Sequence, residues 1–146
     1  MHLERYQLKA DEDLLFFEFI SVGPKGRILK VIQFTLTNSE GIYNLALGDR
    51  NLSTQKIDYL VVSDNQDSEK VLATVVSAIY AFTDRHMDAW VFAEGSTEAR
   101  TRLYRMGISK YFEKVTEDFF ILGQIDSAWE PFIIGRNYEA FVVKRK

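Results

Sequence analysis

The sequence contains no cysteine, only two histidines and only two prolines among its 146 residues. The absence of cysteine excludes a disulfide framework, thiol chemistry and a cysteine-ligated zinc site. Two histidines are too few for a multi-histidine metal site, and they give poor support for a nucleophile–histidine pair. Neither a P-loop nor a GxGxxG sequence is present. We therefore expect neither a bound metal nor a cofactor.

Long apolar runs are missing as well. No run approaches the ~18–20 apolar residues that are needed to span a bilayer, and the start, MHLERYQLK, lacks the apolar region of a signal peptide. We expect a cytoplasmic protein that has no membrane partner, and the lack of cysteine fits a reducing compartment. The net charge of −3 and the pI of about 5.4 disfavour nucleic acid as a partner, except through a local basic patch.

The first half of the chain has the texture of strands. With 47% apolar residues and this length, we expect one domain over residues 1–146. Period-2 alternation and β-branched residues predict strands, and short turns join antiparallel neighbours. Lys30 falls out of the apolar pattern of its strand. A loop is expected over 48–55, and the expected strands are 15–22, 27–37, 42–47 and 57–62.

The second half begins with apolar residues at helical spacing, which predict a helix over 68–85. A second helix is expected over 97–106, where Gly107 would end it in the left-handed conformation. Further strands are expected at 89–93, 119–122 and 140–143, with a loop over 126–136. The fold class is therefore α+β, a mixed and mostly antiparallel sheet in the order ββββ-α-β-α-β-β with two main helices packed on it. The strands at 57–62 and 89–93 are expected to be parallel.

The segment GSTEARTRLYR, 95–105, is the first candidate site. The start of a helix offers unpaired amide groups and a partial positive charge, which together with guanidinium groups suit a phosphate or carboxylate. Helical spacing places Arg100 and Arg102 about 160° apart, whereas Arg102 and Arg105 share a face. The other interpretation is a solvated arginine face that pairs with nearby acids. The residues expected to bind an anion are Gly95, Ser96, Thr97, Arg100 and Arg102.

A second group of polar residues follows the two strands that we expect to be parallel. Ligands tend to lie beyond the carboxyl ends of such strands. If these strands are neighbours, Asp64, Asn65, Glu94, Gly95 and Ser96 meet at one edge of the sheet and form a small polar site. Alternatively, Asp64, Asn65 and Ser96 are helix caps and Glu94 is a solvated loop acid.

The C-terminal tail is locally basic and contains aromatic residues. Two interpretations are open for it: bases stack on the aromatic rings of a nucleic-acid site, or the rings close the core while the charges are solvated. The residues concerned are Trp129, Phe132, Arg136, Tyr138, Phe141, Lys144, Arg145 and Lys146.

The order of elements over 27–122, three or four strands and then α-β-α-β, is similar to the core of the GNAT acyltransferase fold. The segment RTRLYRMGI, 100–108, resembles the late helix of that superfamily, in which a tyrosine often serves as general acid. This resemblance implies that Tyr104 is a catalytic acid. The chain departs from the pattern at DNQDSEKVLA, 64–73, where three acids and no glycine replace the glycine-rich loop that grips the cofactor pyrophosphate.

A second set of stretches is spread along the chain: EFISVGPKG (18–26), YNLALGD (43–49), KVLATV (70–75), GSTEARTRLY (95–104), WEPF and NYEAFVVKRK. With these stretches, nearly the whole chain resembles an uncharacterised bacterial family, a domain of unknown function. The resemblance implies no activity.

Three functional hypotheses follow. The first is a small binding or interaction module whose anion-binding surface at the second helix takes a phosphate-bearing small molecule. The second is a diverged GNAT-like acyltransferase with Tyr104 as its acid. The third is a structural domain that binds a protein partner through an apolar sheet face, because residues 15–20 are apolar on both faces of their strand.

Overall fold

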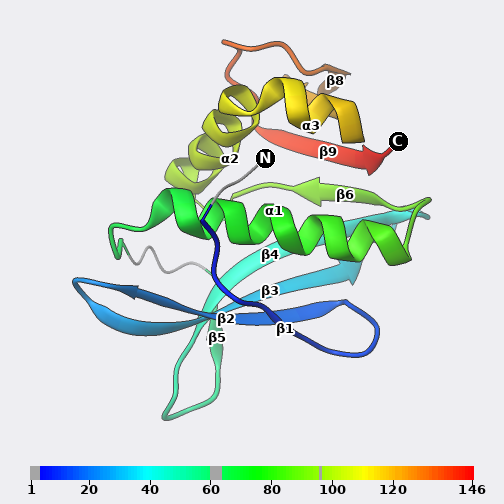
Figure 1. Cartoon of the computed structure of the whole chain (residues 1–146). Helices are drawn as coiled ribbons and strands as arrows, with labels where there is room; N and C mark the ends of the chain where they lie inside the picture. The colour runs from blue at the N-terminus through cyan, green and yellow to red at the C-terminus, as the bar shows by residue number, and fades with distance from the viewer. Residues whose placement is uncertain (1–3, 60–63, 96) are drawn as a thin grey trace.

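The computed structural model describes residues 4–59, 64–95 and 97–146, and within these ranges the chain forms one mixed sheet and three helices (Figure 1). This arrangement confirms the α+β class. The elements in chain order are β1 (Lys9–Ala10), β2 (Phe16–Gly23), β3 (Gly26–Leu36), β4 (Ile42–Arg50), β5 (Ile57–Asp58), α1 (Ser68–Arg85), β6 (Trp90–Ala93), α2 (Glu98–Lys110), α3 (Phe112–Asp118), β7 (Phe119–Ile125), β8 (Ala128–Pro131) and β9 (Ala140–Arg145).

The sheet has the strand order β1-β2-β3-β4-β6-β9-β7-β8, and β5 pairs with β4. Among the described strands, β4 and β6 form the parallel pair, and the other pairs are antiparallel. Residues 60–62 of the strand expected over 57–62 lie outside the described residues. The described part, β5, pairs antiparallel with β4, so the expectation that this strand lies parallel to β6 is wrong. The physical reason is that β4 continues to Arg50 through the expected loop, and β5 folds back on its far end with Arg50 opposite Ile57.

Parallel pairing of β4 with β6 runs from Ile42↔Trp90 to Leu45↔Ala93 and ends there within the described residues. Beyond Leu45, β4 continues beside β3 for four more residues, while the chain after β6 turns towards α2. The two strands therefore part at their carboxyl ends. This opening is close to the residues that the sequence marks as candidates.

The core lies between the sheet and α1, which crosses in front of β4 and β6 in Figure 1. The apolar stripe of α1 is buried as its spacing predicts, and the Phe82 ring stacks on Phe34 of β3 with 4.2 Å between ring centroids. On β2, Phe17 and Phe19 face this core, whereas Ile20 and Val22 are exposed on the other face. None of the helices in the described ranges is long and apolar enough to cross a bilayer.

Two further expectations are corrected. Helix α2 does not end at Gly107 but continues to Lys110, because Gly107 serves close packing and not a left-handed turn. A Cβ on Gly107 would lie 2.1 Å from Cδ2 of Leu72 on α1, so a larger residue there would require the Leu72 side chain to shift. The expected loop over 126–136 also contains a strand, β8, which pairs with β7.

Lys30, which interrupts the apolar pattern of β3, is buried and only 3% exposed. Its Nζ lies 2.8 Å from the Asp49 carboxylate on β4. A buried charge of this kind is tolerated because a partner of opposite sign is held beside it.

Candidate functional site

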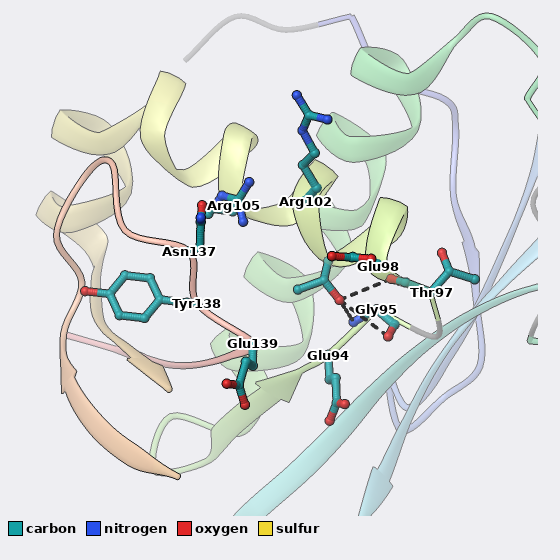
Figure 2. Close-up of a pocket in the computed structure, with 10 residues that line it drawn as sticks. Glu94, Gly95, Thr97, Glu98, Arg102, Arg105, Asn137, Tyr138 and Glu139 are labelled. Atoms are coloured by element: carbon teal, nitrogen blue, oxygen red, sulfur yellow. Dashed lines mark hydrogen bonds between the residues drawn. The ribbon is translucent and has the colours of Figure 1, made fainter. Parts of the chain in front are cut away.

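The N-terminal half of α2 borders a hollow with a volume of about 560 Å³. The hollow, which we call the α2 hollow, lies between the end of β6, the exposed side of α2 and the segment that leads into β9 (Figure 2). Its wall is mostly polar and charged. The lining residues are Glu94, Gly95, Thr97, Glu98, Thr101, Arg102, Arg105, Asn137, Tyr138 and Glu139.

A tight connection between β6 and α2 shapes one side of this hollow. Thr97 is the N-cap of α2, and its hydroxyl accepts a hydrogen bond of 3.2 Å from the amide of Arg100. The amide of Gly95 donates to the hydroxyl of Thr101 over 3.0 Å. A Cβ on Gly95 would lie 2.2 Å from the backbone nitrogen of Thr101, so the close approach requires glycine. Ser96, the remaining candidate of this segment, lies outside the described residues.

The arginines of α2 face two different sides of the helix. Arg100 turns away from the α2 hollow, and its Nη1 donates to the carbonyl oxygens of Leu47 at 2.7 Å and Tyr59 at 3.3 Å. Arg102 and Arg105 both border the α2 hollow, as their shared helix face suggests. Within the described part of the chain, their guanidinium groups form no hydrogen bond or ion pair. The structure therefore separates Arg100 from Arg102 and places Arg105 beside Arg102.

Three carboxylates also border the α2 hollow. Glu98 lies in the first turn of α2, where a negative charge interacts favourably with the helix dipole. Glu94 and Glu139 lie at the neighbouring ends of β6 and β9, because these strands pair up to Ala93↔Phe141. In Figure 2 both side chains lie below the hollow, and Arg102 and Arg105 lie above them. The hollow thus has a basic side with Arg102 and Arg105 and an opposite side with Glu94 and Glu139, while Glu98 lies on the same helix as the two arginines.

Asp64 and Asn65 do not line the α2 hollow with Glu94. Asn65 is buried, and its Nδ2 donates to Ser21 Oγ at 3.1 Å and to the carbonyl oxygen of Gly26 at 3.0 Å. Its Oδ1 accepts from the amide of Lys25 at 2.7 Å. These bonds fix the hairpin of β2 and β3, so the Asn65 side chain has a structural role. Asp64 is exposed just before α1, where it lines a further hollow of about 240 Å³ together with Thr97 and Arg100.

Neither candidate cap bonds to the start of α1 through its side chain. The N-cap is Asp67, which makes no side-chain cap hydrogen bond. Its carboxylate instead accepts hydrogen bonds from the Tyr6 hydroxyl at 2.6 Å and the Ser21 hydroxyl at 2.5 Å. Asp67 therefore ties the N-terminal segment and β2 to the start of α1.

Tyr104 lies in a second hollow, of about 410 Å³, which opens where β4 and β6 part and which we call the splay pocket. The Tyr104 side chain is 6% exposed, and burial raises the pKa of its phenol to about 12, an effect that the positive charge of Arg100 opposes. The phenol is therefore protonated at neutral pH. The lining residues are Gln33, Thr35, Asn44, Leu45, Ala46, Leu47, Tyr59, Glu94, Arg100 and Tyr104.

The residues that sequence reasoning missed come from the segment before β9. Asn137 and Glu139 line the α2 hollow only because β9 inserts between β6 and β7, which no local pattern indicates. The aromatic residues of the basic tail are largely core residues: Phe132, Tyr138 and Phe141 are all buried and in mutual ring contact.

Charges of the tail are also engaged within the chain. Arg136 lies 3.3 Å from the Glu130 carboxylate, and Arg145 lies 2.8 Å from that of Asp84. Arg145 in addition donates to the hydroxyl of Thr83 on α1 at 3.0 Å. These contacts support the interpretation in which the tail completes the fold.

Comparison with known proteins gives one match. A family model described as "Family of unknown function (DUF6934)" matches residues 2–146. No curated protein and no solved structure matches the chain. The match confirms the resemblance of the chain to an uncharacterised family, and it assigns no activity.

Proposed function

We propose that this chain, which belongs to the family of unknown function DUF6934, is a small-ligand-binding protein whose site is the α2 hollow. The ligand carries an anionic group that Arg102 and Arg105 bind. The observation that supports this function is the position of these two guanidinium groups. They lie on one face of α2, border the same hollow and have no partner among the described residues.

Two physical effects favour an anion at this place. Guanidinium groups form charge-assisted hydrogen bonds with carboxylate or phosphate oxygens, and two such groups hold one anion with defined orientation. The N-terminal half of α2, a helix of 13 residues, adds a partial positive charge. A single anionic group therefore suits the basic side of the hollow.

The three carboxylates of the hollow limit the negative charge that a ligand can carry. Glu94, Glu98 and Glu139 line the same hollow and repel a ligand with several negative charges. This disfavours nucleic acids and nucleoside triphosphates as ligands. A small molecule with one phosphate or one carboxylate group fits the charges of the wall.

The proposal is tested by isothermal titration calorimetry with inorganic phosphate and with acetate. The wild type is compared with the variant Arg102→Gln/Arg105→Gln. A charge-matched control is Arg5→Gln/Arg27→Gln, which removes two exposed arginines elsewhere. We expect saturable binding to the wild type and the control and a loss of at least tenfold in affinity for the Arg102/Arg105 variant. Equal affinity for all three proteins would contradict the proposal.

A second candidate function is acid catalysis in the splay pocket, which the burial of Tyr104 favours. Tyr104 is a protonated phenol at the opening between β4 and β6, and Glu94 lines the same pocket. A phenol and a carboxylate facing one hollow supply a proton donor and a proton acceptor. This arrangement is in line with the resemblance to acyltransferases of the GNAT fold.

The start of α1 does not fit the pyrophosphate of a coenzyme. Asp64, Asp67 and Glu69 stand where such a site requires glycine and backbone amides, and their charges repel an anion. Thermal unfolding with coenzyme A separates the two candidates. If coenzyme A raises the midpoint temperature of unfolding of the wild type but not of Tyr104→Phe, acyl transfer is favoured. If coenzyme A does not raise the midpoint temperature of the wild type, the α2 hollow is favoured as the site.

A further inference from the structure

The charges around the α2 hollow define the ligand more closely than an anion alone. We infer that the hollow binds a small zwitterion, which carries one ammonium group and one carboxylate or phosphate group. The inference rests on the proposed function of this site and adds the second charge of the ligand. Glu94 and Glu139 bind the ammonium group, while Arg102 and Arg105 bind the oxyanion.

The side chains of Glu94 and Glu139 have little structural role. The amide of Asp126 donates to Glu139 Oε1 over a long distance of 3.4 Å. Glu94 forms no hydrogen bond or ion pair with any part of the chain that the structure describes. Other acids of this protein are engaged: Glu69 lies 2.6 Å from Lys110, and Asp84 lies 2.8 Å from Arg145.

The carboxylates of Glu94 and Glu139 both border the α2 hollow. They extend from the paired ends of β6 and β9 and lie on the same side of the hollow in Figure 2. Two carboxylates that border one hollow repel each other. An ammonium group has three donors and a positive charge, and between Glu94 and Glu139 it offsets this repulsion.

Glu94 and Glu139 lie across the hollow from Arg102 and Arg105 in Figure 2. No ion pair between described residues joins Glu94 or Glu139 to Arg102 or Arg105, although all four line the same wall. A purely anionic ligand would meet three carboxylates, Glu98 of α2 included, and a purely cationic ligand would meet two guanidinium groups. A zwitterion satisfies both sides at once.

The experiment uses three matched series: linear ω-amino acids from glycine to 6-aminohexanoate, the corresponding carboxylates without the amine, and the corresponding amines without the carboxylate. Calorimetry compares the wild type with Glu94→Gln/Glu139→Gln and with Arg102→Gln/Arg105→Gln. The control Glu40→Gln/Glu113→Gln removes two exposed carboxylates elsewhere. Thermal midpoints of all variants verify that the fold is retained.

We expect at least one ω-amino acid to bind the wild type and the control tenfold or more tightly than its matched carboxylate and its matched amine. The Glu94/Glu139 variant should lose this preference while it keeps its affinity for inorganic phosphate. Equal binding of amino acid and carboxylate overturns the zwitterion inference and leaves the anion site standing. Preference for the amine, or binding of none of the three series, overturns the zwitterion inference. The proposed function is overturned as well if the wild type does not bind inorganic phosphate.

Discussion

The guanidinium group of Arg100 donates a hydrogen bond of 2.7 Å to the carbonyl oxygen of Leu47, 53 residues earlier in the chain. Leu47 lies just beyond Leu45, the last residue of β4 that pairs with β6. Arg100 thus links α2 to β4 where the parallel strands part. Its neighbour in the sequence motif, Arg102, lies on the other side of α2, so two arginines two residues apart have different roles.

The first prediction separates these roles. Arg100→Met keeps the aliphatic stem but removes the donors to Leu47 and Tyr59, so we expect the free energy of unfolding to fall by about 1–3 kcal/mol. Urea denaturation measures this change. The control Arg102→Met removes a guanidinium without a partner among the described residues and should change stability by less than about 0.5 kcal/mol. Equal losses for the two variants would refute the distinction.

The second prediction concerns Asn65, a candidate site residue that the structure shows as a buried clamp. Asn65→Ala leaves the amide of Lys25 and the carbonyl oxygen of Gly26 without their partner, so we expect a loss of about 1–3 kcal/mol in stability. The affinity for phosphate should not change at temperatures where the variant is folded. Asn38→Ala, at an exposed turn, is the matched control. A stable Asn65→Ala protein that no longer binds phosphate would place Asn65 in the binding site.

The third prediction concerns Gly95. An alanine Cβ would lie 2.2 Å from the backbone nitrogen of Thr101, and backbone in the first turn of α2 cannot move without disturbing the helix. We expect Gly95→Ala to destabilise the protein by about 1–3 kcal/mol, as overpacking does. Chemical denaturation measures the change. If the variant is as stable as the wild type, the close approach at Gly95 is not needed for folding.

The fourth prediction is a pH dependence that arises from Tyr104. The pKa of its phenol is about 12 in the folded state, above the ordinary value of 10.0. Between these two values the folded protein holds a proton that the unfolded chain has released, so stability falls as pH rises. One such proton contributes a slope of about 1.4 kcal/mol per pH unit. Below pH 10 this contribution is fully present.

Denaturation of the wild type and Tyr104→Phe from pH 9 to pH 12 tests this dependence. Burial also raises the pKa of Tyr6, Tyr59 and Tyr80, so both proteins should lose stability at high pH. The slope should nevertheless be shallower for Tyr104→Phe. Parallel curves would show that Tyr104 titrates at its ordinary pKa and is not buried as described.

Local patterns predicted the parts of this fold that depend on local spacing. The bounds of α1, Ser68–Arg85, match the expected helix because its apolar stripe and polar flanks determine both ends. In the same way, helical spacing predicted that Arg100 and Arg102 lie on different sides of α2. Gly107 shows the limit, since a glycine that ends a helix and a glycine that packs against Leu72 look alike in sequence.

The candidate site could be predicted only on its α2 side. Arg102 and Arg105 follow from the spacing within one helix, whereas Glu139 joins them through the insertion of β9 beside β6. That pairing depends on long-range packing of the sheet. Asp64 and Asn65 do not share a hollow with Glu94 for the same reason, because the parallel neighbour of β6 is β4 and not the strand at 57–58; Asp64 instead lines a hollow with Thr97 and Arg100.

The most direct test of the binding site is a titration of ¹⁵N-labelled protein with inorganic phosphate, followed by two-dimensional NMR. We predict saturable shifts of the Nε–Hε signals of Arg102 and Arg105 and of the backbone amides of Gly95, Thr97 and Glu139. The Nε–Hε signal of Arg100 should move little. Shifts at Arg100 and around the splay pocket, with none at Arg102 and Arg105, would contradict the account and move the site to the opening between β4 and β6.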